Sequence, residues 1–311
     1  MTRFIIKRVI FAFISLFIIV SATFFLMHIV PGDPFSDENN KIPPEILESM
    51  RAHYGLNDPI HIQYFNYLKS VISWDLGPSY TYKGITVNEI INAGFPVSLV
   101  LGSIALFIGV SLGLLLGIIA ALNHNRTKDY LAMVIAVIGI SVPSFILAAL
   151  FQYVFAVKLG WFPVAKWGSL SQVVLPALTL AAGPLAVIAR ITRSSMLEVL
   201  SKNYIKTAKA KGIGKWRIIY KHGLRNALLT VTTYLGPMIV GVITGTFIIE
   251  KIFGIPGLGS HFVVSVMNRD YTVIMGTTVF YSILLLVAIL LVDIAYSIID
   301  PRIKFTAGKG A

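Results

Sequence analysis

Residues 96–122, PVSLVLGSIALFIGVSLGLLLGIIAAL, contain no charged side chain. A helix needs about 20 consecutive apolar residues to cross the hydrocarbon core of a bilayer, so this stretch is long enough to span it. The whole chain of 311 residues is similar in character, because 56% of its residues are hydrophobic and only 13% are charged. Average soluble proteins are less hydrophobic and more highly charged. The sequence therefore predicts an all-α membrane protein.

Further apolar stretches indicate that the chain crosses the membrane several times. They cover residues 9–27, 131–157, 173–189, 228–249 and 273–299. The stretch 173–189 is the weakest, because it is short and contains Pro176 and Pro184. Residues 9–27 could also form a cleaved signal peptide, but the apolar core of such a peptide has only about 7–15 residues. We therefore predict an uncleaved first helix and six transmembrane helices in total.

The distribution of basic residues orients these helices. With six spans, most of the 26 Lys and Arg residues fall on one side of the membrane, including Arg3, Lys7, Arg8 and the basic cluster of residues 190–225. Basic residues are enriched in cytoplasmic loops, so both termini and this cluster are expected in the cytoplasm. Omitting the span 173–189 would place the cluster on the opposite side, which supports keeping that span. The charge of +12 is thus better explained by membrane orientation than by nucleic-acid binding.

Residues 31–95 form a polar segment with eight acidic residues, and it is expected outside the cell as a small folded insert. Its turn signals include Pro31-Gly32-Asp33-Pro34, and residues 44–54 are expected to form a short helix. The predicted organisation is an N-terminal transmembrane helix (1–30), this extracytoplasmic insert (31–95), a five-helix core (96–300) and a cytoplasmic tail (301–311). The core includes short cytoplasmic helices at about residues 200–226.

Small residues recur at helical spacing within two of the predicted spans. Gly109, Gly113 and Gly117 are four residues apart, as are Gly241 and Gly245. Small residues at this spacing allow helices to approach closely in lipid. We expect close helix packing at both places rather than contact with a substrate.

Ionisable residues and catalytic motifs are scarce in the predicted spans. Asp293 is the one acidic residue clearly inside a span, and it is expected to pair with a nearby Arg or hydroxyl group rather than to carry protons. The motifs of zinc proteases and serine hydrolases are absent, and the chain contains no cysteine. Gly212 to Trp216 lack the upstream glycine and the Ser or Thr of a phosphate-binding loop. We expect no catalytic, metal or cofactor site in this chain, so any ATP must be bound by another chain.

The most basic segment, residues 203–226 (NYIKTAKAKGIGKWRIIYKHGLRN), contains no acidic residue. Its periodicity predicts a short helix with Tyr204, Ile205 and Ala208 on one face, a glycine turn at Gly212, and a second short helix. Such a pair of helices could lie on anionic lipid, or it could dock into a groove of a partner protein. The residues alone leave both interpretations open.

Two parts of this segment resemble a known motif. Residues 204–212 (YIKTAKAKG) and 222–228 (HGLRNAL) are similar to the coupling-helix motif of ABC importer permeases, in the B-type form found in oligopeptide and dipeptide importers. Lys206 and Thr207 replace the Glu and the first Ala of the general importer motif, as is typical of the peptide branch, whereas Ala208 and Gly212 match it. Further similar stretches run in order along the chain, among them residues 54–59 (YGLNDP), 143–145 (PSF), 189–193 (ARITR), 256–259 (PGLG), 269–271 (RDY) and 300–302 (DPR).

This resemblance implies a type I ABC importer permease fold in a bacterial or archaeal cell membrane. The substrate would be an oligopeptide or a dipeptide, with nickel or another small solute as an alternative. The implied partners are a second, C-type permease, two cytoplasmic ATPases that hold ATP and Mg, an external peptide-binding protein, and membrane lipid. The residues expected to couple the chain to the ATPases are Tyr204, Lys206, Thr207, Ala208, Gly212 and Trp216. A possible outer gate loop contains Phe253, Pro256, Gly257, Leu258 and Gly259; a rigid linker is the alternative there.

Two other classes of protein are weighed against this one. An ion-coupled secondary carrier would need no ATPase but would need buried acids, for which Asp293 is the candidate. A lipid-binding scaffold would use the basic segment on membranes alone.

Overall fold

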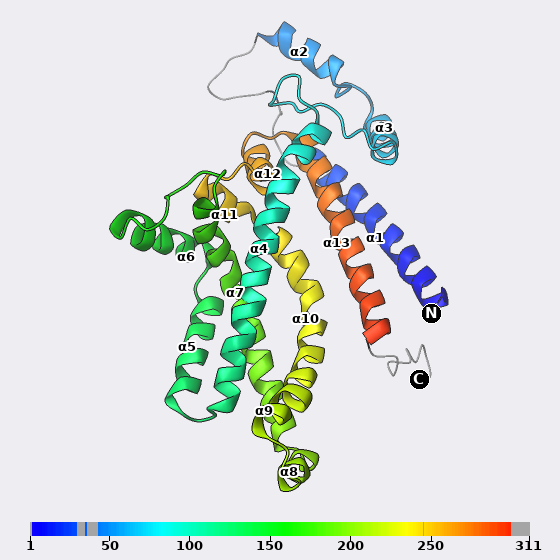
Figure 1. Ribbon diagram of the computed structural model, residues 1–311. Coiled ribbons are helices and arrows are strands. Elements are labelled where there is room, and N and C mark those ends of the chain that lie inside the picture. Colours follow the sequence, from blue (N-terminus) through cyan, green and yellow to red (C-terminus); the bar gives the residue numbers. More distant parts are fainter. Residues whose placement is uncertain (1, 30–34, 36–42, 245, 300–311) are drawn as a thin grey trace. The chain divides into compact units, whose positions relative to one another are not determined.

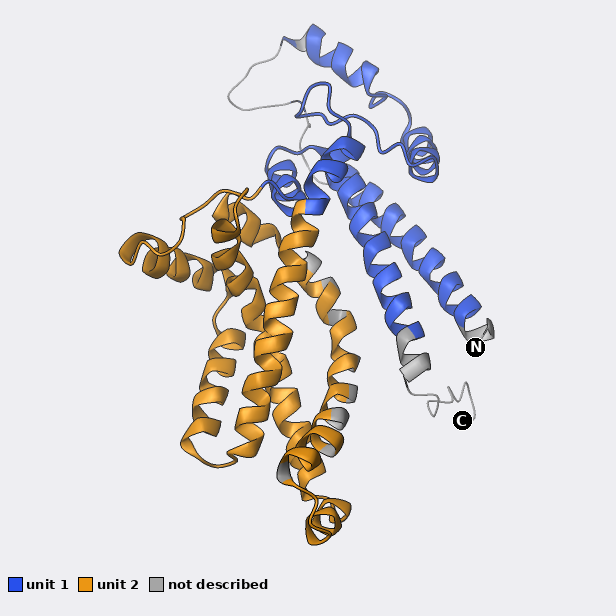
Figure 2. Cartoon of the chain, in the orientation of Figure 1, with its two compact units in different colours: residues 1–96, 256–311 blue, residues 97–255 orange. Residues whose placement is uncertain are grey.

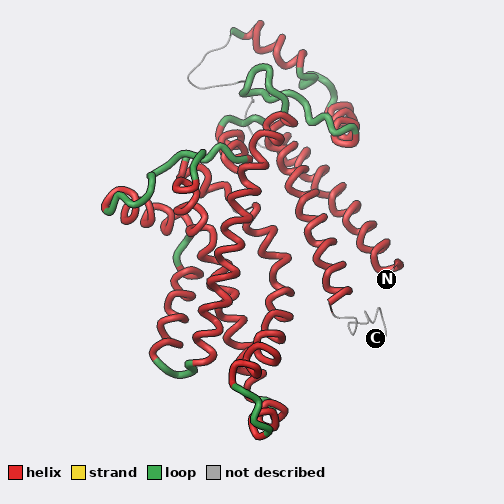
Figure 3. Tube along the Cα trace, in the orientation of Figure 1, coloured by secondary structure: helices red, strands yellow, loops and turns green. Residues whose placement is uncertain are grey.

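The computed structural model describes residues 2–29, 35, 43–244 and 246–299, most of which are helical (Figures 1 and 3). The chain divides into two compact units (Figure 2). Unit 1 comprises Met1–Pro96 and Pro256–Ala311, and unit 2 comprises Val97–Ile255. The elements, with η for π-helical segments, are α1 Thr2–Ile29, α2 Pro44–His53, α3 Ile60–Ile72, α4 Val87–Leu122, α5 Thr127–Ser141, α6 Ser144–Phe151, η1 Gln152–Lys158, α7 Leu170–Ser201, α8 Asn203–Ala210, α9 Lys215–Ile218, η2 Ile219–Leu224, α10 Arg225–Thr244, α11 Thr246–Phe253, α12 Leu258–Met267 and α13 Tyr271–Ile299.

Among the described residues, four helices are long and apolar enough to cross a membrane, namely α1, α4, α7 and α13. Two bent helix pairs, α5 with α6 and η1, and α11 with α12, would raise the number to six if each pair counts as one span. The all-α membrane fold predicted from the sequence is confirmed. The predicted fifth span, residues 228–249, is not one of the four long helices; it covers most of α10 and the start of α11.

Unit 1 is built around the packing of α1 against α13. The insert is fastened to the start of α13 by Asp270, which is buried. One carboxylate oxygen of Asp270 accepts hydrogen bonds from the Ser79 hydroxyl and, at 3.0 Å, from the backbone N–H of Thr81. The other accepts a bond from the N–H of Val273 at 3.3 Å, in the first turn of α13. Because one side chain binds both segments, the insert is a folded part of unit 1.

In unit 2, α7 packs against α5, α6, α10 and η2. Gly109, Gly113 and Gly117 of α4 also face it: a Cβ atom at Gly113 would lie 2.8 Å from Ile188 Cβ, and one at Gly117 would lie 2.6 Å from the Ala189 carbonyl oxygen. These distances are too short for any side chain, so only glycine allows this approach. The prediction of close helix packing is confirmed for this glycine stripe.

The second predicted span begins earlier than the apolar stretch indicated. We expected the helix to start at Pro96, but α4 begins at Val87. The reason is a capping box: the backbone N–H of Thr86 donates to Glu89 Oε2 at 2.9 Å, and the N–H of Glu89 donates to Thr86 Oγ1 at 3.2 Å. The first turns of α4 therefore belong to the polar part of the sequence.

The third predicted span, residues 131–157, is not one continuous helix. It breaks between α5 and α6, and the two parts are bent by 110°. Proline explains the break, because Pro143 has no N–H to continue the ladder and forces Val142 into an extended conformation (φ −90°, ψ 121°). By contrast, the weak stretch 173–189 lies within α7, which continues through Pro176 and Pro184.

Candidate functional site

The first half of the basic segment forms α8, whose inner face is fixed by packing within unit 2. Ile205 is completely buried and Ala208 is only 8% exposed. Both belong to a small apolar cluster with Val199 of α7 and Ile218 of α9. Tyr204, by contrast, is about half exposed. Helix α8 is therefore held against the end of α7 by Ile205 and Ala208.

The glycine turn after α8 has the hydrogen bonds of a Schellman motif. Gly212 has a φ of +73° and donates its N–H to the Lys209 carbonyl at 3.0 Å. The N–H of Ile213 donates to the Ala208 carbonyl at 3.1 Å, and its side chain packs on the cluster that contains Ala208. This motif needs a left-handed residue, for which glycine is favoured. The turn expected at Gly212 is present.

The second half of the basic segment forms α9 and η2. Ile219 packs against Met196 of α7 and against Ala227. On the other side, Trp216 and Tyr220 are exposed by 69% and 68%. Two large aromatic side chains are thus exposed within the eight residues that follow the turn at Gly212.

The exposed surface of the basic segment is cationic. Lys206, Thr207, Lys209, Lys211, Arg217 and Lys221 are exposed, whereas the side chain of Arg225 lies outside the described residues. The predicted coupling residues therefore divide into two groups. Ala208 and Gly212 shape and seat the helix pair, while Tyr204, Lys206, Thr207 and Trp216 are accessible to a partner.

The predicted gate loop is divided between the two units. In unit 2, Phe253 is the buried last residue of α11, and its carbonyl accepts the N–H of Lys166 at 2.9 Å. In unit 1, Leu258 and Gly259 are the first residues of α12 and are also buried. A Cβ atom at Gly94 would lie 2.8 Å from the N atom of Leu258. Pro256 is exposed.

Buried acids are more frequent than the sequence indicated. Asp293 forms an ion pair with Arg8, at 3.1 Å from Oδ2 to Nε, as predicted for a structural Arg partner. Unlike the partly buried Asp293, Glu250 of α11 is completely buried, and its Oε1 accepts a hydrogen bond from the Ser98 hydroxyl at 2.6 Å. Sequence reasoning missed Glu250, because it lies one residue beyond the predicted span 228–249.

The contact between Asp129 and Arg193 was also missed. Asp129, in the first turn of α5, is buried, and it binds Arg193 of α7 through both of its oxygens. The N–H of Asn125 also donates to Asp129 Oδ2, at 2.9 Å. Arg193 lies in the family-like stretch 189–193, but no local signal in the sequence indicates that Asp129 is its partner.

A cavity of about 630 Å³ lies in unit 2 where α5 breaks into α6. Its wall is mainly apolar, with Ser144 and Thr179 among its few hydroxyl groups. Tyr234, Met238 and Gly241 of α10 line one side, and Gly183 of α7 another. A Cβ atom at Gly183 or Gly241 would meet no atom within 4 Å. The expected close packing is therefore wrong for Gly241, which faces this cavity, and Gly245 lies outside the described residues.

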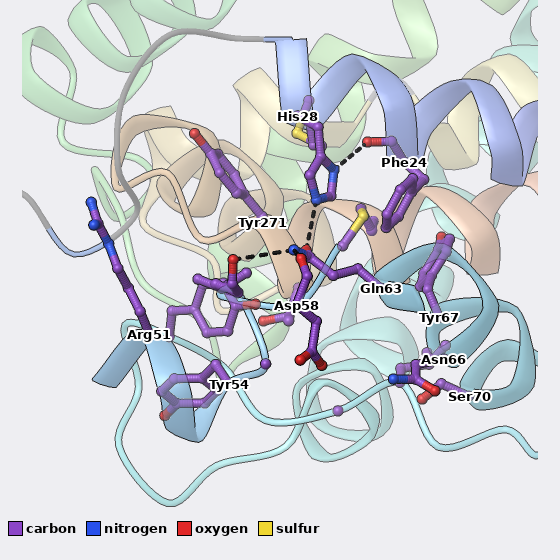
Figure 4. A pocket seen from close by; sticks show the side chains of 18 of the residues that line it. Phe24, His28, Arg51, Tyr54, Asp58, Gln63, Asn66, Tyr67, Ser70 and Tyr271 are labelled. Atoms are coloured by element: carbon purple, nitrogen blue, oxygen red, sulfur yellow. Dashed lines mark hydrogen bonds between the residues drawn. The ribbon is translucent and has the colours of Figure 1, made fainter. Parts of the chain in front are cut away.

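A second pocket, of about 680 Å³, lies in unit 1 between the end of α1, the insert and the start of α13 (Figure 4). His28 and Gln63 meet on its wall, with 3.0 Å between Nε2 and Oε1. Burial raises the pKa of Tyr67 and of Tyr80 above the usual range of a phenol. Both hydroxyls therefore stay protonated at neutral pH.

The fold of the described residues is that of the helical permeases of ABC importers. The described chain is similar to a solved inward-facing structure of the methionine ABC transporter MetNI, with a TM-score of 0.54 and 20% sequence identity over 68% of this chain and 94% of that one. Residues 1–101 match the model of the N-terminal domain and residues 113–305 that of the main domain of binding-protein-dependent transport system inner membrane components. The chain belongs to this family.

Two relatives are similar over nearly their full length. The dipeptide transport system permease protein DppB of Bacillus subtilis is 51% identical, over 98% of each chain. The oligopeptide transport system permease protein OppB of Salmonella typhimurium is 45% identical, over 98% of this chain and 100% of the relative. The predicted family is thereby confirmed.

Proposed function

We propose that this chain is one of two permeases in an ATP-driven importer of dipeptides or oligopeptides. The observation that carries the proposal is the similarity over 98% of the chain to permeases named for these two substrates. The proposed partners are a C-type permease, two ATPases that hold ATP and Mg, and an external peptide-binding protein. The excess of basic residues on one side supports placing both termini and the basic segment in the cytoplasm.

Uptake measurements test the substrate and the partners. The tagged chain would be purified from native membranes, and its copurifying subunits would be reconstituted in liposomes with the binding protein. We expect ATP-dependent uptake of a labelled dipeptide or oligopeptide. Uptake of nickel but not of peptides would contradict the peptide proposal, and uptake driven by an ion gradient without ATPase subunits would contradict the whole assignment.

The exposed side of the helix pair is the proposed contact with an ATPase. Tyr204, Lys206, Thr207 and Trp216 are accessible, and aromatic and basic side chains together suit an acidic groove. Ala208 and Gly212 would contribute indirectly, because they fix the position from which these side chains reach the partner. ATP-driven movement of the ATPases would then be transmitted through Ile205 and Ala208 to α7.

Trp216→Ala tests the docking contact, because loss of a large aromatic anchor typically costs about 2 kcal/mol of binding. We expect ATPase subunits to dissociate from the purified variant at lower salt or detergent concentration than from the parent. Trp161→Ala is a matched control, since Trp161 is exposed to a similar degree but lies in the loop between η1 and α7. Equal retention of the ATPases by both variants would contradict the role of Trp216.

We also propose that the cavity at the break between α5 and α6 is part of the substrate pathway. The break supports this, because irregular backbone at membrane depth is tolerated where it lines a cavity or is buried in protein. The first turn of α6 and the last turn of α5 offer peptide groups that their helices leave without partners. The apolar wall of the cavity would accept substrate side chains of different shapes, because it contains Met238 and two glycines, Gly183 and Gly241, that have free space around them.

A further inference from the structure

Helix α3 of the insert is fastened to one level of the first membrane-spanning helix. Tyr64 of α3 forms a 2.6 Å hydrogen bond with Ser21 of α1, and its ring lies 5.2 Å from that of Phe24. Gln63 contacts His28 one turn further along α1 (Figure 4). The apolar part of α1 runs from Ile5 to Ile29, so these contacts all fall in its last turns. Helix α3 is thus held at the level where α1 leaves the hydrocarbon core.

The direction of α3 is that of a helix lying along a surface. In Figure 1, α3 is seen almost end-on, whereas α1 runs lengthwise through the same view, so the two helices cross. If α1 spans the bilayer, α3 extends along the boundary between lipid and water and does not project away from it. An amphipathic helix at this level places its apolar side towards the acyl chains.

The free side of α3 has the composition that such a position requires. The face that does not contact α1 carries Ile62, Phe65 and Ile72, of which Phe65 is 67% and Ile72 85% exposed. Lys69 lies between them and is also exposed. A lysine stem can lie along apolar surface while its ammonium group reaches lipid phosphate. The helix contains no acidic residue, which suits contact with an anionic headgroup layer.

The apolar surface of α3 continues that of α1. Phe25, Leu26 and Ile29, in the last turns of α1, are exposed. Phe25 also packs against Tyr64 of α3, with 5.2 Å between ring centroids. Large exposed apolar patches mark membrane or protein contacts, and here the patch adjoins a face that α1 would present to lipid.

From this geometry we propose that α3 lies in the headgroup layer of the leaflet that holds the C-terminal end of α1, with Ile62, Phe65 and Ile72 inserted at the edge of the acyl chains. The helix would fix the insert at a constant height above the membrane. The proposal concerns lipid contact alone and does not depend on the transported substrate.

Site-specific fluorescence tests the proposal directly. The chain contains no native cysteine, so single-cysteine variants Phe65→Cys and Ile72→Cys can each be labelled at one place with a bimane dye. The full chain would be reconstituted in phosphatidylcholine and phosphatidylglycerol vesicles, with and without bromine on the acyl chains. Phe13→Cys, at an exposed position within the span of α1, is the lipid control, and Glu48→Cys, at an exposed position of α2, is the water control.

We expect brominated lipid to lower the emission from Phe65→Cys and Ile72→Cys by about as much as that from Phe13→Cys, because a dye on the apolar face of an interfacial helix lies next to the acyl chains that carry the bromine. Iodide in the water should quench Glu48→Cys much more strongly than these two. Two results would overturn the proposal. One is that the α3 labels behave like Glu48→Cys. The other is that they become shielded from iodide only when an external binding protein is added, which would make this face a protein dock.

Discussion

Asp129 and Arg193 are joined by two hydrogen bonds, at 2.6 Å from Nε to Oδ1 and at 2.8 Å from Nη2 to Oδ2. The pair ties the first turn of α5 to α7, although the two residues lie far apart in the sequence. Two parallel bonds between a guanidinium and a carboxylate fix both distance and orientation. The position of α5 on α7 therefore depends on a polar contact as well as on apolar packing.

Asp129→Ala should reduce the stability of the protein, because it leaves Arg193 without its partner. Removing one side of a buried pair costs about 3–5 kcal/mol, but Arg193 is 26% exposed, so water reduces the expected loss to about 2–3 kcal/mol. Thermal unfolding in detergent would measure it. Glu198→Ala is the control, since it removes an exposed ion pair with Lys202 and should cost less than about 1 kcal/mol. Equal effects would show that the pair at Asp129 is not a significant anchor.

Gly117→Ala should destabilise the contact between α4 and α7. The added methyl group would lie 2.6 Å from the Ala189 carbonyl oxygen and from Thr192 Cβ, and overpacking of this kind typically costs about 1–3 kcal/mol. Gly183→Ala is the matched control, since a Cβ atom there meets no neighbour within 4 Å. A lower unfolding temperature is expected for the first variant only. If both unfold like the parent, the glycine stripe does not determine the packing.

Ala208→Leu should impair uptake of peptide while the chain still inserts into the membrane. The larger side chain does not fit between α8 and the cluster at Val199 and Ile218, so α8 would move away from its position. Overpacking typically costs about 1–3 kcal/mol, which corresponds to a loss of coupling of about fivefold or more. ATP hydrolysis and peptide uptake would be measured in the same liposomes. Ala149→Leu, at an exposed position of α6 outside the basic segment, should transport normally, and normal transport by Ala208→Leu would contradict the coupling role.

Gly241→Leu should block transport without reducing stability. The new side chain would extend into the cavity at the break between α5 and α6, where it meets no atom of this chain at its Cβ. We expect peptide uptake to fall about tenfold or more, because an energetic cost of only about 1.4 kcal/mol to the passage of substrate is already a tenfold effect. The unfolding temperature and the copurifying subunits should stay unchanged. Ala149→Leu, exposed on α6 and not part of the cavity wall, is the control. Undiminished uptake by the Gly241 variant would remove the cavity from the pathway.

Features with a local physical cause could be predicted from the sequence. The apolar stretches indicated the long helices, and the run from Ala208 to Ile213 indicated a helix that ends at a glycine. The early start of α4 also had a local signal, since Thr86 and Glu89 are spaced for a capping box. Hydropathy alone did not detect it, because the first turns of that helix are polar.

Features that depend on the three-dimensional arrangement could not be predicted. The periodicity placed Ala208 and Tyr204 on one face of α8, but the positions of α7 and α9 determine that Ala208 is covered and Tyr204 is accessible. Glycine spacing was similarly ambiguous, since the same interval brings Gly113 against α7 and leaves Gly241 open to a cavity. In both cases the identity of the neighbouring element decides the role of a small residue.

The glycine stripe of α4 has a mechanical consequence. With Gly109, Gly113 and Gly117 so close to the backbone of α7, sliding one helix along the other would drive Leu, Ile or Phe side chains into positions where not even a methyl group fits. Within unit 2, α4 and α7 must therefore travel as a single rigid body. The deformation of a transport cycle is then left to the segments without such close contact, namely the proline break after α5 and the side of α10 that lines the cavity.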